Sequence, residues 1–142
     1  MKAILIDPKE KTVSEVEYDG DYKKIYDFIK ADTFEIVTLE NNGDGAFIDE
    51  CGLFKDYQYM WTYNSEKYQG LYGRGTPLCG KALMLGLDES TGDSIAPMTS
   101  RDSVDDCIEF LGVARITSGA KGFNYEYLCN DEIEKLTKEG IL

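Results

Sequence analysis

Short stretches in which apolar and polar residues alternate run through most of the chain, and turn residues separate them. Such alternation over four to eight residues predicts strands with one buried face, and a short apolar run predicts a buried strand. The predicted strands are residues 2–6, 12–18, 33–39, 46–48, 81–85 and 113–116. Asparagine, aspartate and glycine at positions 41–45 can reverse the chain, so residues 33–48 are expected to form a hairpin, as are residues 2–18.

Apolar residues at helical spacing predict two or three short helices. The periodic positions are Tyr22, Ile25, Tyr26 and Ile29 in the first segment, Val104, Cys107, Ile108 and Leu111 in the second, and Ile133 and Leu136 in the third. Asp21, Ser100 or Ser103, and Asn130 are the expected N-caps, and Gly112 is the expected C-cap of the second helix. Together these elements predict one α+β domain over residues 1–142, a mainly antiparallel sheet with two or three short helices packed on it.

Aromatic residues occupy every second position of one segment, at Tyr57, Tyr59, Trp61 and Tyr63. In an extended conformation these four rings point to the same side. Two interpretations follow from this pattern. The rings cover the core as a half-buried edge strand, or they form a contact surface, since tyrosine and tryptophan supply much of the binding energy of protein interfaces. The surrounding residues 51–80 lack a regular period and predict a long loop or a decorated hairpin.

The charge of the chain limits its partners. Fifteen basic and 27 acidic residues give a net charge of −12, with no histidine. Such a chain repels duplex nucleic acid and anionic membranes and is attracted to basic partners. No segment is long and apolar enough to span a bilayer, and Asp7-Pro8 interrupts the N-terminal apolar run before it could act as a signal peptide. We therefore expect a cytoplasmic protein.

Acidic residues gather in two stretches that predict a partner-binding surface. They are Asp32, Glu35, Glu40, Asp44, Asp49 and Glu50 in the first stretch and Asp102, Asp105, Asp106 and Glu109 in the second. On a helix, Asp102, Asp106 and Glu109 would share one face with no basic partner close in sequence. Either this is a solvated surface that keeps the protein soluble, or it occupies a basic groove where phosphates would otherwise lie.

The sequence presents no recognisable catalytic or metal centre. The four cysteines are too far apart in sequence for a zinc or redox motif, and no serine or cysteine has a histidine base. The glycines around Arg74 match no phosphate-binding motif, although Arg74 or Lys81 could meet a phosphate beside Trp61. We therefore expect no catalytic residue, no cofactor and no metal.

Three segments carry a family resemblance. Residues 1–8 and 77–86, together with the strand, turn and strand of residues 34–53, resemble the domain of unknown function 3846 family of small acidic proteins found largely in phages and prophages. The resemblance covers about the first two thirds of the chain and transfers no active-site residue. It implies a phage accessory protein in the cytoplasm of a bacterial host, and such proteins often inhibit defence nucleases, including as anti-CRISPR proteins.

The leading hypothesis is therefore a non-enzymatic inhibitor that binds the basic nucleic-acid groove of a host defence nuclease, such as a Cas protein, through the two acidic stretches, with Tyr59 and Trp61 as anchors. The alternative is a small-ligand binder that sequesters a nucleotide immune signal through Trp61, Arg74 and Lys81. An enzyme of another type and a structural role in the virion stay open, as do homo-oligomerisation and the role of the cysteines.

Overall fold

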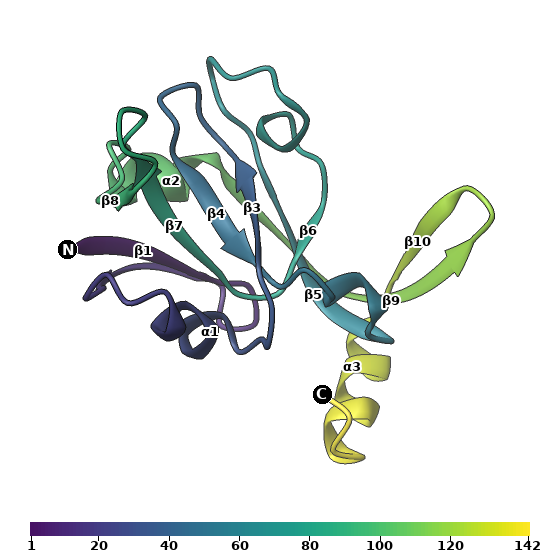
Figure 1. Ribbon diagram of the computed structural model, residues 1–142. Coiled ribbons are helices and arrows are strands. Elements are labelled where there is room, and N and C mark those ends of the chain that lie inside the picture. The colour runs from purple at the N-terminus through teal and green to yellow at the C-terminus, as the bar shows by residue number, and fades with distance from the viewer.

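Two antiparallel sheets form the body of the protein in the computed structural model, which describes residues 1–142 (Figure 1). The first sheet has the order β2-β1-β7-β4-β3, and β8 pairs with β7. Its strands are β1 (Lys2–Asp7), β2 (Thr12–Glu17), β3 (Glu35–Thr38), β4 (Gly45–Ile48), β7 (Ala82–Leu87) and β8 (Ser94–Ile95). The second sheet, in the order β10-β9-β5-β6, contains β5 (Tyr57–Tyr63), β6 (Leu78–Cys79), β9 (Ile108–Gly119) and β10 (Gly122–Tyr127).

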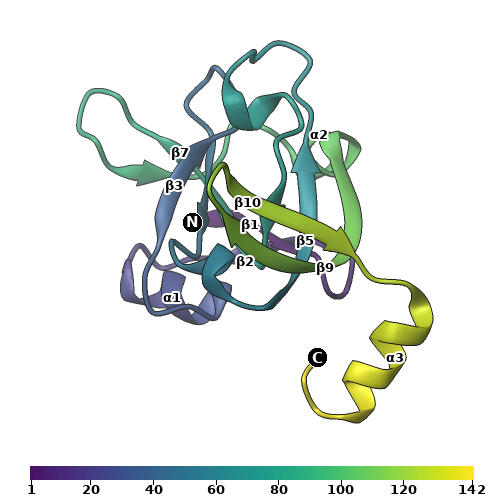
Figure 2. The same cartoon turned by 90° about the vertical axis from the view of Figure 1, so that its right-hand side faces the viewer.

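Three helices accompany the sheets, which confirms the predicted α+β class. They are α1 (Lys23–Ile29), α2 (Arg101–Cys107) and α3 (Asn130–Lys138), and two 3-10 turns span Gly52–Phe54 and Leu71–Gly73. Ser100 caps α2 as predicted, because its side chain accepts a hydrogen bond from the backbone N–H of Ser103. The third helix leads away from the sheets at the C-terminal end of the chain (Figure 2). No helix has the length and apolar character needed to cross a membrane.

The main core lies between the two sheets. Alternate residues of β1, β4 and β7, such as Ile4, Ala46 and Met84, meet Trp61 and Tyr63 of β5 there. Val104 of α2 belongs to the same core. A second core, which contains Ile25 and Ile29, joins α1 to the other face of the first sheet. The first sheet is therefore covered on both faces, and its apolar runs are buried for that reason.

The second predicted helix is shorter than expected. It ends at Cys107. The next residue, Ile108, is the first of β9 and pairs with Tyr63 of β5. Gly112 is consequently no C-cap. It has a φ of +89° and lies at an irregularity of the ladder, where Met60 pairs with Gly112 but Trp61 pairs with Phe110. A glycine adopts this φ without strain, so its freedom serves a β-bulge here.

The two ends of the first sheet have different surroundings. The register pairs Ile6 with Ala82 at one end, where the 7–9 and 79–81 loops lie. At the other end Thr38 pairs with Gly45, next to the turn that joins β3 to β4. Each end carries a separate hollow, one acidic and one lined by lysines.

Candidate functional site

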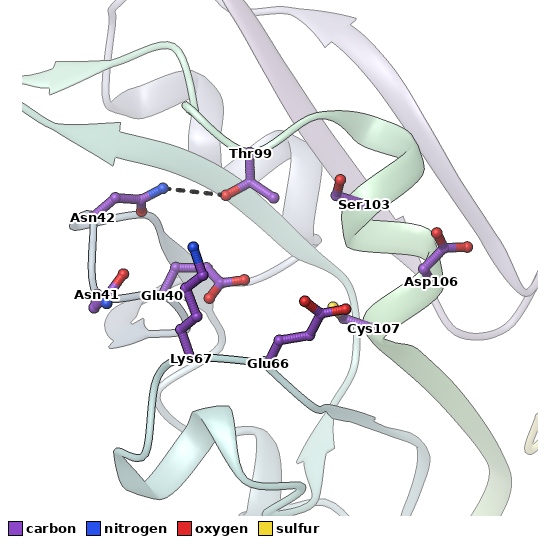
Figure 3. Close-up of a pocket in the computed structure, with 9 residues that line it drawn as sticks. All are labelled: Glu40, Asn41, Asn42, Glu66, Lys67, Thr99, Ser103, Asp106 and Cys107. Carbon is purple, nitrogen blue, oxygen red and sulfur yellow. Dashed lines mark hydrogen bonds between the residues drawn. The ribbon is translucent and has the colours of Figure 1, made fainter.

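An acidic cleft lies at the β3–β4 turn, where three separate segments meet (Figure 3). Its volume is about 440 Å³. The residues that line it are Glu40, Asn41 and Asn42 from the β3–β4 turn, Glu66 and Lys67 from the loop after β5, and Thr99, Ser103, Asp106 and Cys107 from α2 and the segment before it. Three carboxylates and one lysine give this lining a net negative charge.

Glu40 is the fixed carboxylate of the acidic cleft. The hydroxyl of Tyr63 donates to its Oε2 at 2.5 Å, and the hydroxyl of Ser65 donates to its Oε1. Ser65 Oγ in turn accepts the backbone N–H of Tyr68 at 2.9 Å, which orders the loop after β5 that carries Ser65. The Glu40 side chain is thereby oriented by two donors before any partner arrives, so a partner does not have to order it.

The remaining carboxylates of the cleft are more exposed. Glu66 and Asp106 are exposed residues, and neither forms an ion pair. They come from opposite walls of the cleft, since Glu66 follows β5 and Asp106 lies on α2 (Figure 3). Two free carboxylates beside a fixed one are suited to receive an ammonium or guanidinium group.

The chemistry of the cleft does not favour a nucleophile. Burial raises the pKa of the Cys107 thiol, and the negative charges of Glu40, Glu66 and Asp106 add to the rise. Burial, together with the hydrogen bond to Glu40, also raises the pKa of Tyr63 far above its ordinary value. Both groups stay protonated near neutral pH, so the thiol lacks the thiolate character that a nucleophilic cysteine needs. The main chemical property of the cleft is therefore the negative charge of its lining.

The structure brings only part of the first acidic stretch to the cleft. Glu35 pairs with Ile48 at the far end of the β3–β4 hairpin, while Thr38 pairs with Gly45 beside the cleft. The residues that fall at or beyond the far end are Asp32, Glu35, Asp49 and Glu50. Asp49 is also partly neutralised, because its Oδ2 lies 3.5 Å from Lys55 Nζ. The stretch is therefore continuous in sequence but divided in space.

Asp44 was predicted on the partner-binding surface, and that prediction is wrong. Its side chain is fully buried. It accepts hydrogen bonds from the backbone N–H groups of Met98 and Thr99, at 3.1 and 2.8 Å, and from the Thr99 hydroxyl at 2.6 Å. Asp44 thus ties the β3–β4 turn to the segment that leads into α2.

The second acidic stretch also differs from the prediction. Asp102, Asp105 and Asp106 lie exposed on α2, but Glu109 lies on β9, opposite Thr62. The expected shared helical face of Asp102, Asp106 and Glu109 does not form, because the helix ends before Glu109. Asp102 also has a basic partner, since its Oδ1 lies 2.6 Å from Arg101.

The aromatic segment forms an inner strand. Trp61 and Tyr63 are fully buried between the sheets, so their assignment to a contact surface is wrong. The strand β5 pairs with β9 on one side and β6 on the other, which also excludes an edge position. Tyr57 and Tyr59 are half-buried, and the Arg115 guanidinium lies 5.7 Å from the Tyr57 ring centre. Only these two rings of the segment stay accessible to a partner.

The three residues of the alternative nucleotide site do not line one pocket. Trp61 is in the core, and its indole N–H donates to the carbonyl of Gly80 at 3.0 Å. Arg74 is exposed, and its backbone forms an isolated antiparallel β-bridge with that of Asn64 in the loop after β5. Lys81 lies at the other end of the first sheet, in a pocket with Tyr59.

Two charged residues of the cleft were missed from the sequence. Glu66 and Lys67 lie outside the acidic stretches, in a tract without regular period. Only the pairing of β5 with β9 brings them opposite α2, since the backbone N–H of Asn64 donates to the carbonyl of Cys107 at 2.8 Å. No local pattern in the sequence predicts this contact.

Comparison with known proteins assigns a family. No curated protein and no solved structure matches the chain. A family model described as Domain of unknown function (DUF3846) matches residues 1–106, which include the whole first sheet, β5, β6 and most of α2. Because the match covers well over half of the 142 residues, the chain belongs to the DUF3846 family, as its sequence resemblance predicted.

Proposed function

We propose that the protein is a non-enzymatic binding protein whose acidic cleft receives a basic segment of a protein partner. The observation that carries this proposal is the convergence of Glu40, Glu66 and Asp106 from three segments on one cleft that contains a single lysine. A cleft of about 440 Å³ lies within the usual size range of ligand pockets and has room for an arginine or lysine side chain.

The electrostatics of the cleft support a cationic ligand. Glu40 supplies an oriented carboxylate. Glu66 and Asp106 supply carboxylates that form no ion pair within the protein, so a cationic ligand does not have to break one. Arginine pairs with carboxylates through two parallel hydrogen bonds, which gives geometric selectivity as well as energy. The net charge of −12 adds attraction at long range and accelerates the encounter.

The partner that we propose is a nucleic-acid-binding defence nuclease of a phage host, such as a Cas protein. Its nucleic-acid groove is rich in the lysine and arginine side chains that the cleft would accept. Asp102 and Asp105, exposed on α2 beside the cleft, would extend the contact along this groove. The protein would then block the nuclease by occupying the place of the phosphates.

Binding to a purified Cas nuclease, measured by fluorescence anisotropy with and without duplex DNA, tests this function. We expect DNA and the protein to compete for the nuclease, and the affinity to fall steeply as salt rises from low concentration to about 0.15 M. The variant Glu66→Lys/Asp106→Lys should bind at least about tenfold more weakly, because it replaces two attractions by repulsions. A labelled nona-arginine peptide provides a second probe that does not depend on the choice of nuclease.

The matched control is Asp27→Lys/Glu139→Lys, which changes the net charge equally at two exposed carboxylates on α1 and after α3 that form no ion pair. Equal weakening by both double variants would show that net charge alone attracts the partner, and would reject the cleft. If neither the nuclease nor the peptide binds the unmodified protein, the proposal fails.

A further inference from the structure

A second hollow lies at the opposite end of the first sheet and has the opposite charge. Four of the 15 basic residues of the chain line it: Lys9, Lys30, Lys55 and Lys81, which together define the lysine pocket. Two carboxylates, from Asp7 and Asp49, also line the pocket. Four ammonium groups against two carboxylates leave about two positive charges at this place in a chain whose net charge is −12.

Asp7 organises one wall of the lysine pocket. Its Oδ1 accepts the backbone N–H groups of Lys9 and Glu10, at 3.1 and 3.2 Å, and fixes the turn that follows β1. Its Oδ2 lies 3.6 Å from Lys81 Nζ. One largely buried carboxylate thus contacts the backbone of Lys9 and the ammonium group of Lys81.

Asp49 plays the same part on the other wall. Its Oδ1 accepts the backbone N–H of Cys51 at 2.9 Å, and its Oδ2 lies 3.5 Å from Lys55 Nζ. Asp49 is largely buried, whereas more than half of the Lys55 side chain stays exposed. The carboxylate therefore anchors a lysine whose ammonium group still reaches solvent.

The fourth lysine is held in an unfavourable backbone conformation. Lys30 follows α1 with φ 56° and ψ 50°, in the left-handed region that glycine normally occupies at this position of a helix end. A side chain other than glycine in this region costs about 1 kcal/mol. Glycine would fit this backbone better, and the lysine adds a fourth basic residue to the lining of the pocket.

The floor of the pocket is rigid. The indole N–H of Trp61 donates to the carbonyl of Gly80 at 3.0 Å, and the backbone N–H of Gly80 donates to the carbonyl of Tyr59 at 2.9 Å. These bonds fix the loop that presents Lys81 against β5. The half-buried ring of Tyr59 lines the pocket beside that loop.

We propose that the lysine pocket binds a phosphoryl group, as inorganic phosphate or as the phosphate of a small monoester. Lysine is a common phosphate ligand, acting as a point charge. A phosphate monoester carries about −1.5 to −2 charges at neutral pH, which matches the excess of two positive charges in the pocket. The volume of about 180 Å³ is below the usual range for larger organic ligands and selects a compact anion. This site is separate from the acidic cleft and does not depend on the function proposed for it.

Isothermal titration calorimetry with inorganic phosphate, at an ionic strength held near 0.15 M with chloride, tests the proposal. We expect saturable binding at one site. The double variant Lys30→Gly/Lys55→Met should bind phosphate at least tenfold more weakly. Glycine suits the backbone at position 30, so this variant should keep its fold, which circular dichroism and urea unfolding can verify.

The matched control is Lys23→Met/Lys121→Met, which removes two exposed lysines that lie outside the pocket and form no ion pair. An equal loss of affinity in this control, or no saturable heat with the unmodified protein, would overturn the proposal. Adenosine monophosphate provides a second arm. If this nucleotide binds more tightly than phosphate and Tyr59→Leu abolishes the difference, the site is assigned to a phosphate monoester. If the two affinities are equal, the site is assigned to the phosphoryl group alone.

Discussion

Removal of the Asp44 carboxylate is the most direct test of how the acidic cleft is held together. The buried side chain accepts three hydrogen bonds, two from backbone N–H groups and one from the Thr99 hydroxyl. It connects the turn that carries Glu40 to the segment that leads into α2. Asp44→Ala removes all three bonds and leaves the two amides without a protein acceptor, while the 3.4 Å bond from Asn42 Nδ2 to the Thr99 hydroxyl still joins the two segments.

The magnitude follows from these contacts. A hydrogen bond to a charged group contributes about 1.5 to 3 kcal/mol, and an abandoned half-buried N–H costs about 1 to 3 kcal/mol unless water reaches it. Because Met98 and Thr99 lie near the surface, part of this cost is recovered by hydration. We expect Asp44→Ala to lower the free energy of unfolding by about 3 to 5 kcal/mol, a large share of the 5 to 15 kcal/mol typical of a domain.

Urea unfolding followed by circular dichroism measures this loss. Thr99→Val removes the hydroxyl bond to Asp44 and the 3.4 Å bond that the same hydroxyl accepts from Asn42 Nδ2, and it should cost about 1.5 to 3 kcal/mol. The double variant should cost less than the sum because both changes remove the bond between Thr99 and Asp44. The control Asp32→Ala changes an exposed acid and should stay within about 0.5 kcal/mol. A loss below about 1 kcal/mol for Asp44→Ala, or strict additivity with Thr99→Val, would refute the reasoning.

Three further outcomes are expected. Lys30→Gly should raise the free energy of unfolding by about 0.5 to 1 kcal/mol, because glycine adopts the left-handed backbone conformation of this position without strain. Thermal unfolding measures this change, and a decrease in the free energy of unfolding would contradict the prediction. Burial raises the pKa of the Cys79 thiol from 9.0 to about 11, so its contribution to stability is complete below pH 9 and is lost as the pH rises to 11. Unfolding curves at pH 8 and pH 11 measure how far the free energy of unfolding falls between these two pH values. This fall should be about 2 to 3 kcal/mol smaller in Cys79→Ala than in the unmodified protein, and equal falls would contradict this origin. In the native protein, Ellman's reagent should modify the exposed Cys51 and Cys129 quickly and the buried Cys79 and half-buried Cys107 slowly; four equal rates would contradict this assignment.

The local elements were predictable where turn residues and alternation agree. Asparagine, aspartate and glycine between two alternating stretches specified the β3–β4 hairpin, and the apolar run of residues 82–85 specified the buried strand β7. The end of α2 was not predictable in this way. Val104, Cys107, Ile108 and Leu111 fit a helical period, and a glycine at position 112 is equally suitable for a C-cap and for a β-bulge, because both need a positive φ. Pairing with β5, a contact distant in sequence, decided between them.

Which face of the aromatic strand β5 is buried was also not predictable from the local sequence pattern. Alternation predicted that Trp61 and Tyr63 share a face, and both do lie in the core between the sheets. Period two does not tell which face meets the other sheet, however, so the same pattern was compatible with a surface of rings. The acidic stretch of residues 32–50 was misleading for a related reason. A hairpin places its turn at one end of a sheet and both of its strand ends at the other, so Glu40 in the turn and Glu35 at the start of β3 do not form one patch.

The fold places the acidic cleft and the lysine pocket at opposite ends of the first sheet, and this separation explains how one acidic chain can carry both. The six residues of β7 span about 20 Å between the two ends. At physiological ionic strength the Debye length is about 8 Å, so exposed charges at one end are largely screened from the other. Each hollow therefore responds to its own lining and only weakly to the net charge of −12. It follows that Glu66→Lys/Asp106→Lys should leave phosphate affinity at the lysine pocket unchanged at about 0.15 M salt, and should raise it only when calorimetry is repeated at low salt. A marked change in phosphate affinity at the higher salt would show that the two ends are coupled through the structure and do not act as separate sites.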